Sequence, residues 1–298
     1  MLPLYHSPIY THGLDPKARF PRERYDLVHA GLAGHPQIEF REPSALEPAL
    51  LELAHDPNYA QAFLDGTLDP KAARRIGLTP WTEAIVERTM ILTNGTVSAT
   101  RDVLEQGGIA GNLGGGTHHA YHDFGSGYCI FNDLAIAARM AQRDHGIERV
   151  LILDLDVHQG DGTAAIFEDD PSVHTVSFHC GKNFPFRKMT SDLDVIFDEG
   201  VEDDFYLQRL SDVLGRELDL FEPDLILFQA GVDTLKTDRL GHLSLTREGL
   251  QRRNKMVFRA AAARGLPLVL TMGGGYGVPI ETSVAAHVDL FEQAAGSA

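Results

Sequence analysis

The second half of the chain alternates near-continuous apolar runs with stretches of helical character, and this alternation constrains the fold most strongly. The apolar runs cover residues 150–157, 173–178, 225–230 and 266–272. Each run suits a strand that is buried on both faces of a parallel sheet. The helical stretches cover residues 132–144, 203–220 and 247–264. Together they predict an α/β fold, a doubly wound and mostly parallel sheet with helices on both faces.

The first part of the chain is less regular. Residues 1 to about 80 are interrupted by prolines and predict short helices and loops. A long helix is expected over residues 81–105, because Pro80 precedes it and two glycines, Gly107 and Gly108, follow it. No repeat, low-complexity tract or Pro/Gly/Ser-rich linker divides the chain, so residues 1–298 are expected to form a single domain.

Composition excludes several classes of function. The net charge of −16 argues against non-specific nucleic-acid binding, which needs clustered Lys and Arg. The same charge is compatible with a cationic substrate, or with solubility alone. The two cysteines cannot form a disulfide framework, and the N-terminus lacks a secretory pattern. No apolar run approaches the roughly 20 residues that span a bilayer. We expect a cytoplasmic protein without nucleic-acid or membrane partners.

Polar side chains gather where the predicted strands end. In open parallel sheets ligands bind beyond the carboxyl ends of the strands. Four predicted strand ends are followed by polar residues that could bind a ligand or react with it: residues 154–158, Ser177 with His179, Asp233, and residues 273–276. This convergence predicts a functional site at that edge of the sheet.

A metal site is the first hypothesis for this edge. Asp156 and His158 are two residues apart on a predicted extended segment, so both side chains leave the same face. With Asp233 they form an Asp₂His set, which leaves a coordination position free, as catalytic zinc requires. Asp154 lies two residues before Asp156, so its side chain is expected to leave the same face deeper in the strand. A monovalent cation, a histidine or both could balance its charge there. Alternatively, these carboxylates only cap neighbouring loops and helices.

Two further motifs add candidate catalytic groups. The segment Gly114–His119 (GGGTHH) places two adjacent imidazoles, His118 and His119, just after a glycine-rich turn. Imidazoles near carboxylates serve well as acid and base, and Asp154 and Asp161 could supply those partners. Tyr276 follows another glycine string and could donate to a developing oxyanion. Taken alone, each motif also has an explanation without a function. The histidine pair can be incidental in a loop, and the tyrosine can be a core or rim residue.

The motifs occur in an order that resembles the histone deacetylase family over nearly the whole chain from Tyr5 onward. Segments 183–188 and 238–244 look most similar to the class IV branch and its bacterial relatives. The motifs that carry the resemblance are His118-His119, 126–133 (SGYCIFND), 154–162 (DLDVHQGDG), 229–233 (QAGVD) and 273–276 (GGGY).

The resemblance implies a zinc-dependent amidohydrolase that removes an acyl group from lysine by means of metal-activated water. Asp156, His158 and Asp233 would hold the zinc. His119 would be the general base, oriented by Asp161. His118, bonded to Asp154, would be its electrostatic partner, and Tyr276 would donate to the carbonyl oxygen.

The resemblance also implies a structural K⁺ or Na⁺ beside the zinc and a narrow acyl-lysine tunnel. The monovalent ion would use Asp154, Ser177 and Phe178, together with Asp156 and His158, several of them through backbone carbonyls. Gly116, Tyr128 and Phe184 would line the tunnel. The fold would be the arginase/deacetylase type, with an eight-stranded parallel sheet.

Several alternatives stay open at this point. The substrate could be acetyl-lysine, a longer acyl-lysine, an acetylpolyamine or another small acyl-amine. Fe²⁺ suits the same N/O ligands as Zn²⁺. A ureohydrolase of the arginase type would need a second metal and more bridging carboxylates, and a non-catalytic acyl-amine binding protein would not need the full catalytic set. The sequence does not indicate an oligomeric state.

Overall fold

The computed structural model describes residues 1–298 and builds a single eight-stranded sheet in which all neighbouring strands run parallel. The strand order is β2-β1-β3-β8-β7-β4-β5-β6. This confirms the predicted parallel α/β fold. The strands are β1 (Leu2–Tyr5), β2 (Ile38–Arg41), β3 (Ile109–Asn112), β4 (Val150–Asp154), β5 (Val173–Cys180), β6 (Leu193–Phe197), β7 (Leu225–Gln229) and β8 (Leu268–Thr271).

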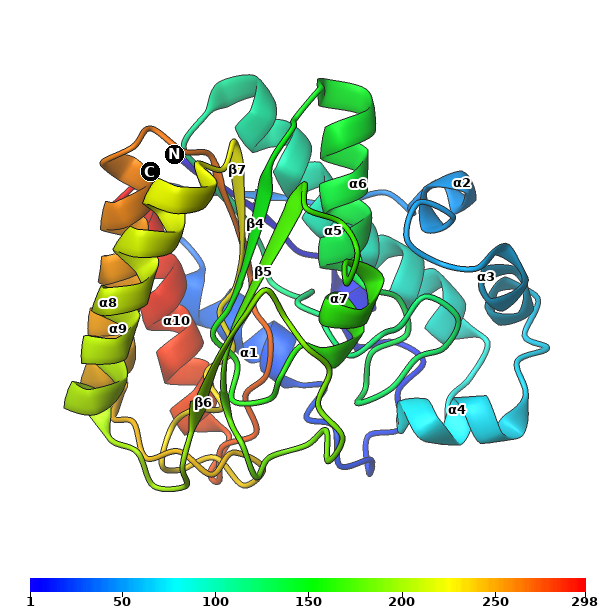
Figure 1. Ribbon diagram of the computed structural model, residues 1–298. Coiled ribbons are helices and arrows are strands. Elements are labelled where there is room, and N and C mark those ends of the chain that lie inside the picture. The colour runs from blue at the N-terminus through cyan, green and yellow to red at the C-terminus, as the bar shows by residue number, and fades with distance from the viewer.

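Helices cover both faces of the sheet (Figure 1). One layer contains α1, α8, α9 and α10, which pack against one another. The opposite layer contains α5 and α6, with α2 and α7 against α6, while α3 and α4 lie farther out (Figure 1). The helices are η1 (Pro8–Thr11), α1 (Arg24–Leu32), α2 (Pro48–Leu51), α3 (Pro57–Leu64), α4 (Pro70–Ile76), α5 (Ala84–Gln106), α6 (Asp133–His145), α7 (Asp161–Ile166), α8 (Asp203–Phe221), α9 (Arg247–Ala262) and α10 (Glu281–Ala295).

The four long helices predicted from the sequence are present, with ends shifted by at most a few residues. Their boundaries follow local capping chemistry. The Asn132 side chain accepts a hydrogen bond from the backbone N–H of Ala135, and the Thr246 side chain accepts one from Gly249, so α6 and α9 begin there. The long helix α5 begins at Ala84 rather than directly after Pro80.

The four predicted strands are also present, but strands β1, β2, β3 and β6 were not predicted from the sequence. Three of these are only four residues long, too short for a clear periodic pattern. The strands β2 and β6 lie at the two edges of the sheet, where β2 is only half-buried along its length. An edge strand therefore lacks the continuous apolar run that identified the central strands.

Central strands β4, β7 and β8 are buried along their full length, so the sheet is covered on both faces. One continuous hydrophobic core includes both helical layers and the sheet. None of the helices combines the length and apolar composition that a membrane crossing requires.

Candidate active site

The catalytic candidates lie at the carboxyl ends of four adjacent strands, β3, β8, β7 and β4. The histidine pair follows β3, residues 273–276 follow β8, Asp233 follows β7, and residues 156–158 follow β4. The sequence reading named the ends of the other three strands but missed β3. The structure therefore explains how the glycine-rich loop reaches the same edge of the sheet.

Asp156, His158 and Asp233 form a compact buried cluster in which one ligand atom from each residue lies within 4.8 Å of the others. Nδ1 of His158 is 2.9 Å from Oδ1 of Asp156 and 3.2 Å from Oδ2 of Asp233. The sequence argument that Asp156 and His158 share the face of an extended strand is wrong, because β4 ends at Asp154. A bend beyond the strand end brings both side chains close to Asp233 instead.

The charges in this cluster favour a cation. Burial and the neighbouring Asp156 raise the pKa of Asp233. Burial opposes protonation of His158, yet the two carboxylates outweigh it and raise the pKa of the ring. Oδ2 of Asp233 is buried and receives no hydrogen bond. Because two carboxylates and an imidazole point at one centre and leave an acceptor unused, the donor set fits a divalent ion that takes N and O ligands, such as zinc or iron.

Neighbouring groups hold the two carboxylates in place. The side-chain amide of Gln229 donates to Oδ2 of Asp156 at 2.8 Å, and the backbone N–H of Gly274 donates to the same oxygen at 2.9 Å. The N–H of Val157 donates to Oδ1 of Asp233 at 2.9 Å. The sequence reading assigned no role to Gln229. A buried polar residue at the end of the apolar strand β7 was the signal that could have found it.

The loop that carries the histidine pair is anchored by Asp133, another residue without a predicted role. Its carboxylate accepts the backbone N–H groups of Gly116 and Thr117 at 3.0 and 2.7 Å. Gly116 has a φ of 74°, and a Cβ there would lie 2.9 Å from the side chain of Gln229. A glycine is therefore required where the loop passes against Gln229.

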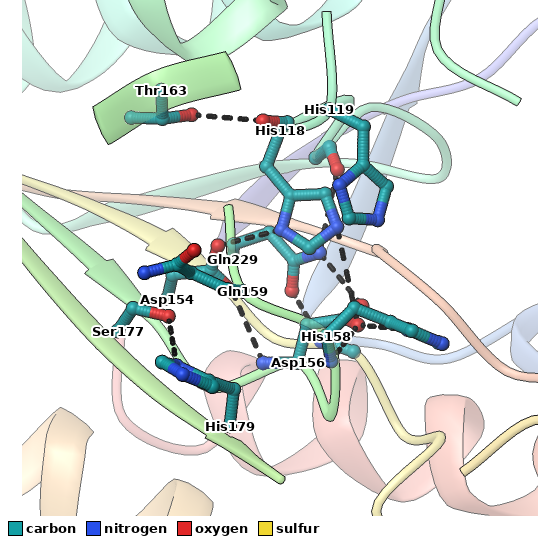
Figure 2. A network of polar contacts seen from close by, with 12 residues as sticks. His118, His119, Asp154, Asp156, His158, Gln159, Thr163, Ser177, His179 and Gln229 are labelled. Atoms are coloured by element: carbon teal, nitrogen blue, oxygen red, sulfur yellow. Dashed lines mark hydrogen bonds and ion pairs between the residues drawn. The ribbon is translucent and has the colours of Figure 1, made fainter. Parts of the chain in front are cut away.

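Each histidine of the pair contacts its own carboxylate. Figure 2 shows His118 beside Asp154, with the His119 ring next to that of His118. Nδ1 of His118 lies 2.6 Å from Oδ2 of Asp154, and Nδ1 of His119 lies 2.6 Å from Oδ1 of Asp161. Asp154 is thus balanced by a histidine, one of the possibilities expected from the sequence. Asp161 also accepts a hydrogen bond from the Tyr121 hydroxyl at 2.9 Å.

The two pairs differ in their protonation. Burial disfavours the charged form of His118, but Asp154 and Asp156 outweigh it and raise its pKa to about 9. Burial and the charge on His118 lower the pKa of His119 to about 4, although Asp161 opposes this. At neutral pH the histidine pair therefore combines a cationic imidazole, His118, with a neutral one, His119. The neutral ring is suited to accept a proton.

A cavity of about 420 Å³ connects this cluster to the surface. Gly116, Tyr128 and Phe184, the predicted tunnel residues, are among those that line it, and so is Tyr276. The Phe184 ring packs edge-on against His119, with 4.9 Å between ring centroids. Tyr276 is 8% exposed, and burial raises its pKa well above the usual value, so its hydroxyl keeps its proton.

The residues predicted for a monovalent cation lie on β4 and β5. Asp154 and Ser177 are direct partners in the sheet register, and the Ser177 hydroxyl lies 3.0 Å from Nδ1 of His179. The Phe178 side chain is fully buried against Phe197 and Tyr206, so only its backbone could face an ion. The monovalent site stays a prediction.

The chain matches the family model of the histone deacetylase domain over residues 18–291. It is 46% identical over 288 residues to an uncharacterized protein of Picosynechococcus sp., with 96% of this chain and 95% of that protein covered. It is 30% identical over 243 residues to histone deacetylase 2 of Arabidopsis thaliana, covering 79% of this chain and 62% of that protein. It is also 33% identical over 221 residues to the acetoin utilization protein AcuC of Bacillus subtilis, covering 66% and 56%.

Among solved structures, the crystal structure of the HDA15 HD domain superposes with a TM-score of 0.84 at 21% identity and covers 99% of this chain and 90% of that one. This similarity concerns the fold. The chain spans only about three fifths of the length of the two named relatives. The family model nevertheless covers most of the chain, and by this match the protein belongs to the histone deacetylase family.

Proposed function

We propose that this protein is a metal-dependent deacylase that hydrolyses the amide of N-acyl-lysine, with an acetyl or a longer acyl group. The observation that carries the proposal is the open Asp156–His158–Asp233 cluster at the base of a cavity that is also lined by His118 and His119, each paired with a buried aspartate. The named relatives include a histone deacetylase, which agrees with this chemistry.

Zinc is the proposed ion, with iron as the alternative, and Asp156, His158 and Asp233 are its proposed ligands. A divalent ion bound there would polarise the amide carbonyl and lower the pKa of a water molecule toward about 7. We further propose the monovalent cation at Asp154, Ser177 and the backbone of Phe178, where it would offset the carboxylates behind the cluster.

The chain's own residues supply the proton transfers. His119 is neutral near pH 7 and takes the proton of the attacking water, while Asp161 stabilises the imidazolium that forms. The same ring then returns the proton to the leaving amine. His118 keeps its proton and provides a fixed positive charge beside the reacting carbonyl. Tyr276 donates a hydrogen bond to the developing oxyanion.

An acetylpolyamine or another small acyl-amine is the second candidate substrate, and one relative is named for acetoin utilization rather than for histones. The cavity favours lysine over a polyamine. Its only carboxylates are Asp156 and Asp233, both in the metal cluster, and the exposed part of its lining carries Arg75 and Lys182. A polycation would therefore meet like charges at the entrance without an acidic partner.

We propose that residues 1–298 act as one catalytic domain, because all eight strands belong to one sheet around one core. The test of function is a substrate panel: zinc-loaded and iron-loaded protein assayed with acyl-lysine peptides from acetyl to myristoyl and with acetylpolyamines. Hydrolysis of acyl-lysine that is lost together with bound metal in Asp156→Ala supports the proposal. Stoichiometric metal without hydrolysis of any substrate would favour a non-catalytic binding protein.

A further inference from the structure

The cavity is also lined by two buried arginines that the proposed mechanism does not use. Arg24, at the start of α1, and Arg88, within α5, are 4% and 5% exposed. Both guanidinium groups lie beside the same two rings: Cζ of Arg24 is 5.4 Å from the Phe20 ring and 5.5 Å from the Tyr25 ring, and Cζ of Arg88 is 6.0 and 5.8 Å from them. We call Arg24 and Arg88 the inner arginine pair.

Neither member of the inner arginine pair has an anionic partner. Arg24 donates to the carbonyl oxygens of Gly275 and Gly273 at 2.9 and 2.8 Å, and its buried Nε has no partner. Arg88 donates through Nε to the carbonyl oxygen of Tyr10 at 2.7 Å and through Nη2 to the Tyr25 hydroxyl at 3.3 Å. All of these acceptors are neutral.

The third buried arginine, Arg253, also has only neutral acceptors, but all three of its side-chain nitrogens donate hydrogen bonds and it does not line the cavity. Arg41, Arg139 and Arg247 each contact a carboxylate, and all three are more exposed than the inner arginine pair. Two buried cations without a counterion are unfavourable, since burial removes their hydration and they repel each other. Burial and the nearby Arg24 lower the pKa of Arg88, whereas Tyr25, Tyr276 and Asp233 outweigh burial and raise the pKa of Arg24.

A carboxylate is the anion that fits this position. Guanidinium groups bind carboxylates in a planar arrangement through paired N–H donors, and the bond is stronger where water is excluded. Arg24 also lies close to a proposed catalytic group, because its Cζ is 5.4 Å from the Tyr276 ring centroid. Both arginines line the same cavity as the metal cluster, so an acyl chain held by that cluster shares this cavity with the inner arginine pair.

We infer that the inner arginine pair binds the terminal carboxylate of an acyl chain, so that lysines carrying succinyl or glutaryl groups are substrates. This inference rests on the deacylase function proposed above. The reaction is the same hydrolysis: the oxygen of water bonds to the acyl carbon, the bond from that carbon to the lysine nitrogen breaks, and the nitrogen gains a proton. The products are free lysine and a dicarboxylate.

The carboxylate could also come from a second source, the acid released from any acyl group. The experiment separates the two sources. Metal-loaded wild type, Arg88→Met and Arg88→Lys are assayed with succinyl-lysine, butyryl-lysine and acetyl-lysine peptides, and binding of free succinate and free acetate is measured by calorimetry. Arg209→Met is the matched control, because Arg209 is an exposed arginine in α8 that does not line the cavity.

We expect kcat/KM for succinyl-lysine to exceed that for butyryl-lysine in wild type. Arg88→Met should lower this ratio by about tenfold or more, the effect of losing one charged hydrogen bond. Arg88→Lys should retain part of the preference, and Arg209→Met should leave the ratio unchanged. Circular dichroism and acetyl-lysine turnover of Arg88→Met show whether the variant is folded.

Two results would overturn the inference. One is a ratio that does not respond to Arg88→Met in folded protein. The other is acetate binding that depends on Arg88 without hydrolysis of succinyl-lysine, which would assign the pair to the released acid. If no acyl-lysine is hydrolysed at all, the proposed function fails. Arg88-dependent binding of free succinate then still tests the arginine pair, and its absence contradicts carboxylate binding.

Discussion

Nδ1 of His119 lies 2.6 Å from Oδ1 of Asp161, and both side chains are buried beside the Asp156–His158–Asp233 cluster. The contact leaves Nε2 of His119 as the ring nitrogen that faces away from the carboxylate. It also places a negative charge next to a ring whose own pKa is lowered to about 4 by burial and by His118. Proton uptake by His119 during the reaction therefore depends on Asp161.

We predict that Asp161→Asn lowers kcat by about 10²-fold or more, the scale of a lost acid–base contribution. The amide keeps the shape of the side chain but cannot stabilise the imidazolium. Steady-state kinetics on an acetyl-lysine peptide measure the effect. Tyr121→Phe, which removes only the hydroxyl that donates to Asp161, should have a much smaller effect. Equal losses in the two variants would contradict the assignment.

Tyr276→Phe should reduce kcat by about 10²–10³-fold, as expected for the loss of one oxyanion donor. Metal content, measured by elemental analysis, should stay unchanged because the hydroxyl is not a proposed ligand. Tyr206→Phe is the control, since Tyr206 is also buried and its hydroxyl has no hydrogen-bond partner. Turnover near that of wild type in Tyr276→Phe would refute the assigned role.

Gln229→Leu should weaken metal binding by about 10–100-fold, the usual effect of losing a group that orients a ligand. The amide of Gln229 donates to Asp156 at 2.8 Å, and leucine cannot replace that bond. Competition with a chelator measures the dissociation constant. Gln208→Leu on the exposed side of α8 is the control. An unchanged metal affinity in Gln229→Leu would show that the other contacts suffice to hold Asp156.

Substitution of one glycine should remove the metal, and substitution of another should stabilise the fold. A Cβ at Gly274 would lie 2.0 Å from Oδ2 of Asp233, so Gly274→Ala should displace a proposed ligand and cause loss of the metal. A Cβ at Gly215, inside α8, would meet nothing within 4 Å, so Gly215→Ala should raise the free energy of unfolding by about 0.5–1 kcal/mol. Urea unfolding and elemental analysis test both; retention of metal by Gly274→Ala contradicts the geometry.

Stability should fall in mild acid because of His55. Its Nδ1 donates to the carbonyl oxygen of Tyr121 at 2.9 Å, and its Nε2 accepts the N–H of Asn132 at 2.8 Å, which requires a neutral ring. Burial lowers its pKa to about 4, below the unfolded value of about 6.5. The unfolded state thus binds the proton first, and stability is complete above pH 6.5 and lost as the pH falls toward 4.

The contribution of His55 is at most about 3 kcal/mol. Urea unfolding at a series of pH values measures the slope. His55→Gln can make similar hydrogen bonds without titrating, so its stability should depend less on pH over this range. Some slope will remain, because burial also lowers the pKa values of His6 and His287. An identical slope in wild type and His55→Gln would contradict the prediction.

The sequence by itself determined the layered α/β fold and most of the candidate residues. The buried central strands are continuous apolar runs, and polar residues such as Asp156, Asp233 and Tyr276 follow them at the edge where parallel strands end together. Local order along the chain was therefore enough to predict which residues would meet. Short or edge strands such as β2 and β3 carry no comparable pattern and were missed.

Only the tertiary structure decided which partner each group has. The pairings of His118 with Asp154 and of His119 with Asp161, which the family resemblance implied but local sequence alone left open, join segments that are 36 and 42 residues apart. The roles of Gln229 and Asp133, and the absence of a counterion at Arg24 and Arg88, likewise depend on groups brought together from distant segments. The physical reason is that hydrogen bonds and charges act over a few ångströms in space, and the packing of helices against the sheet sets those distances.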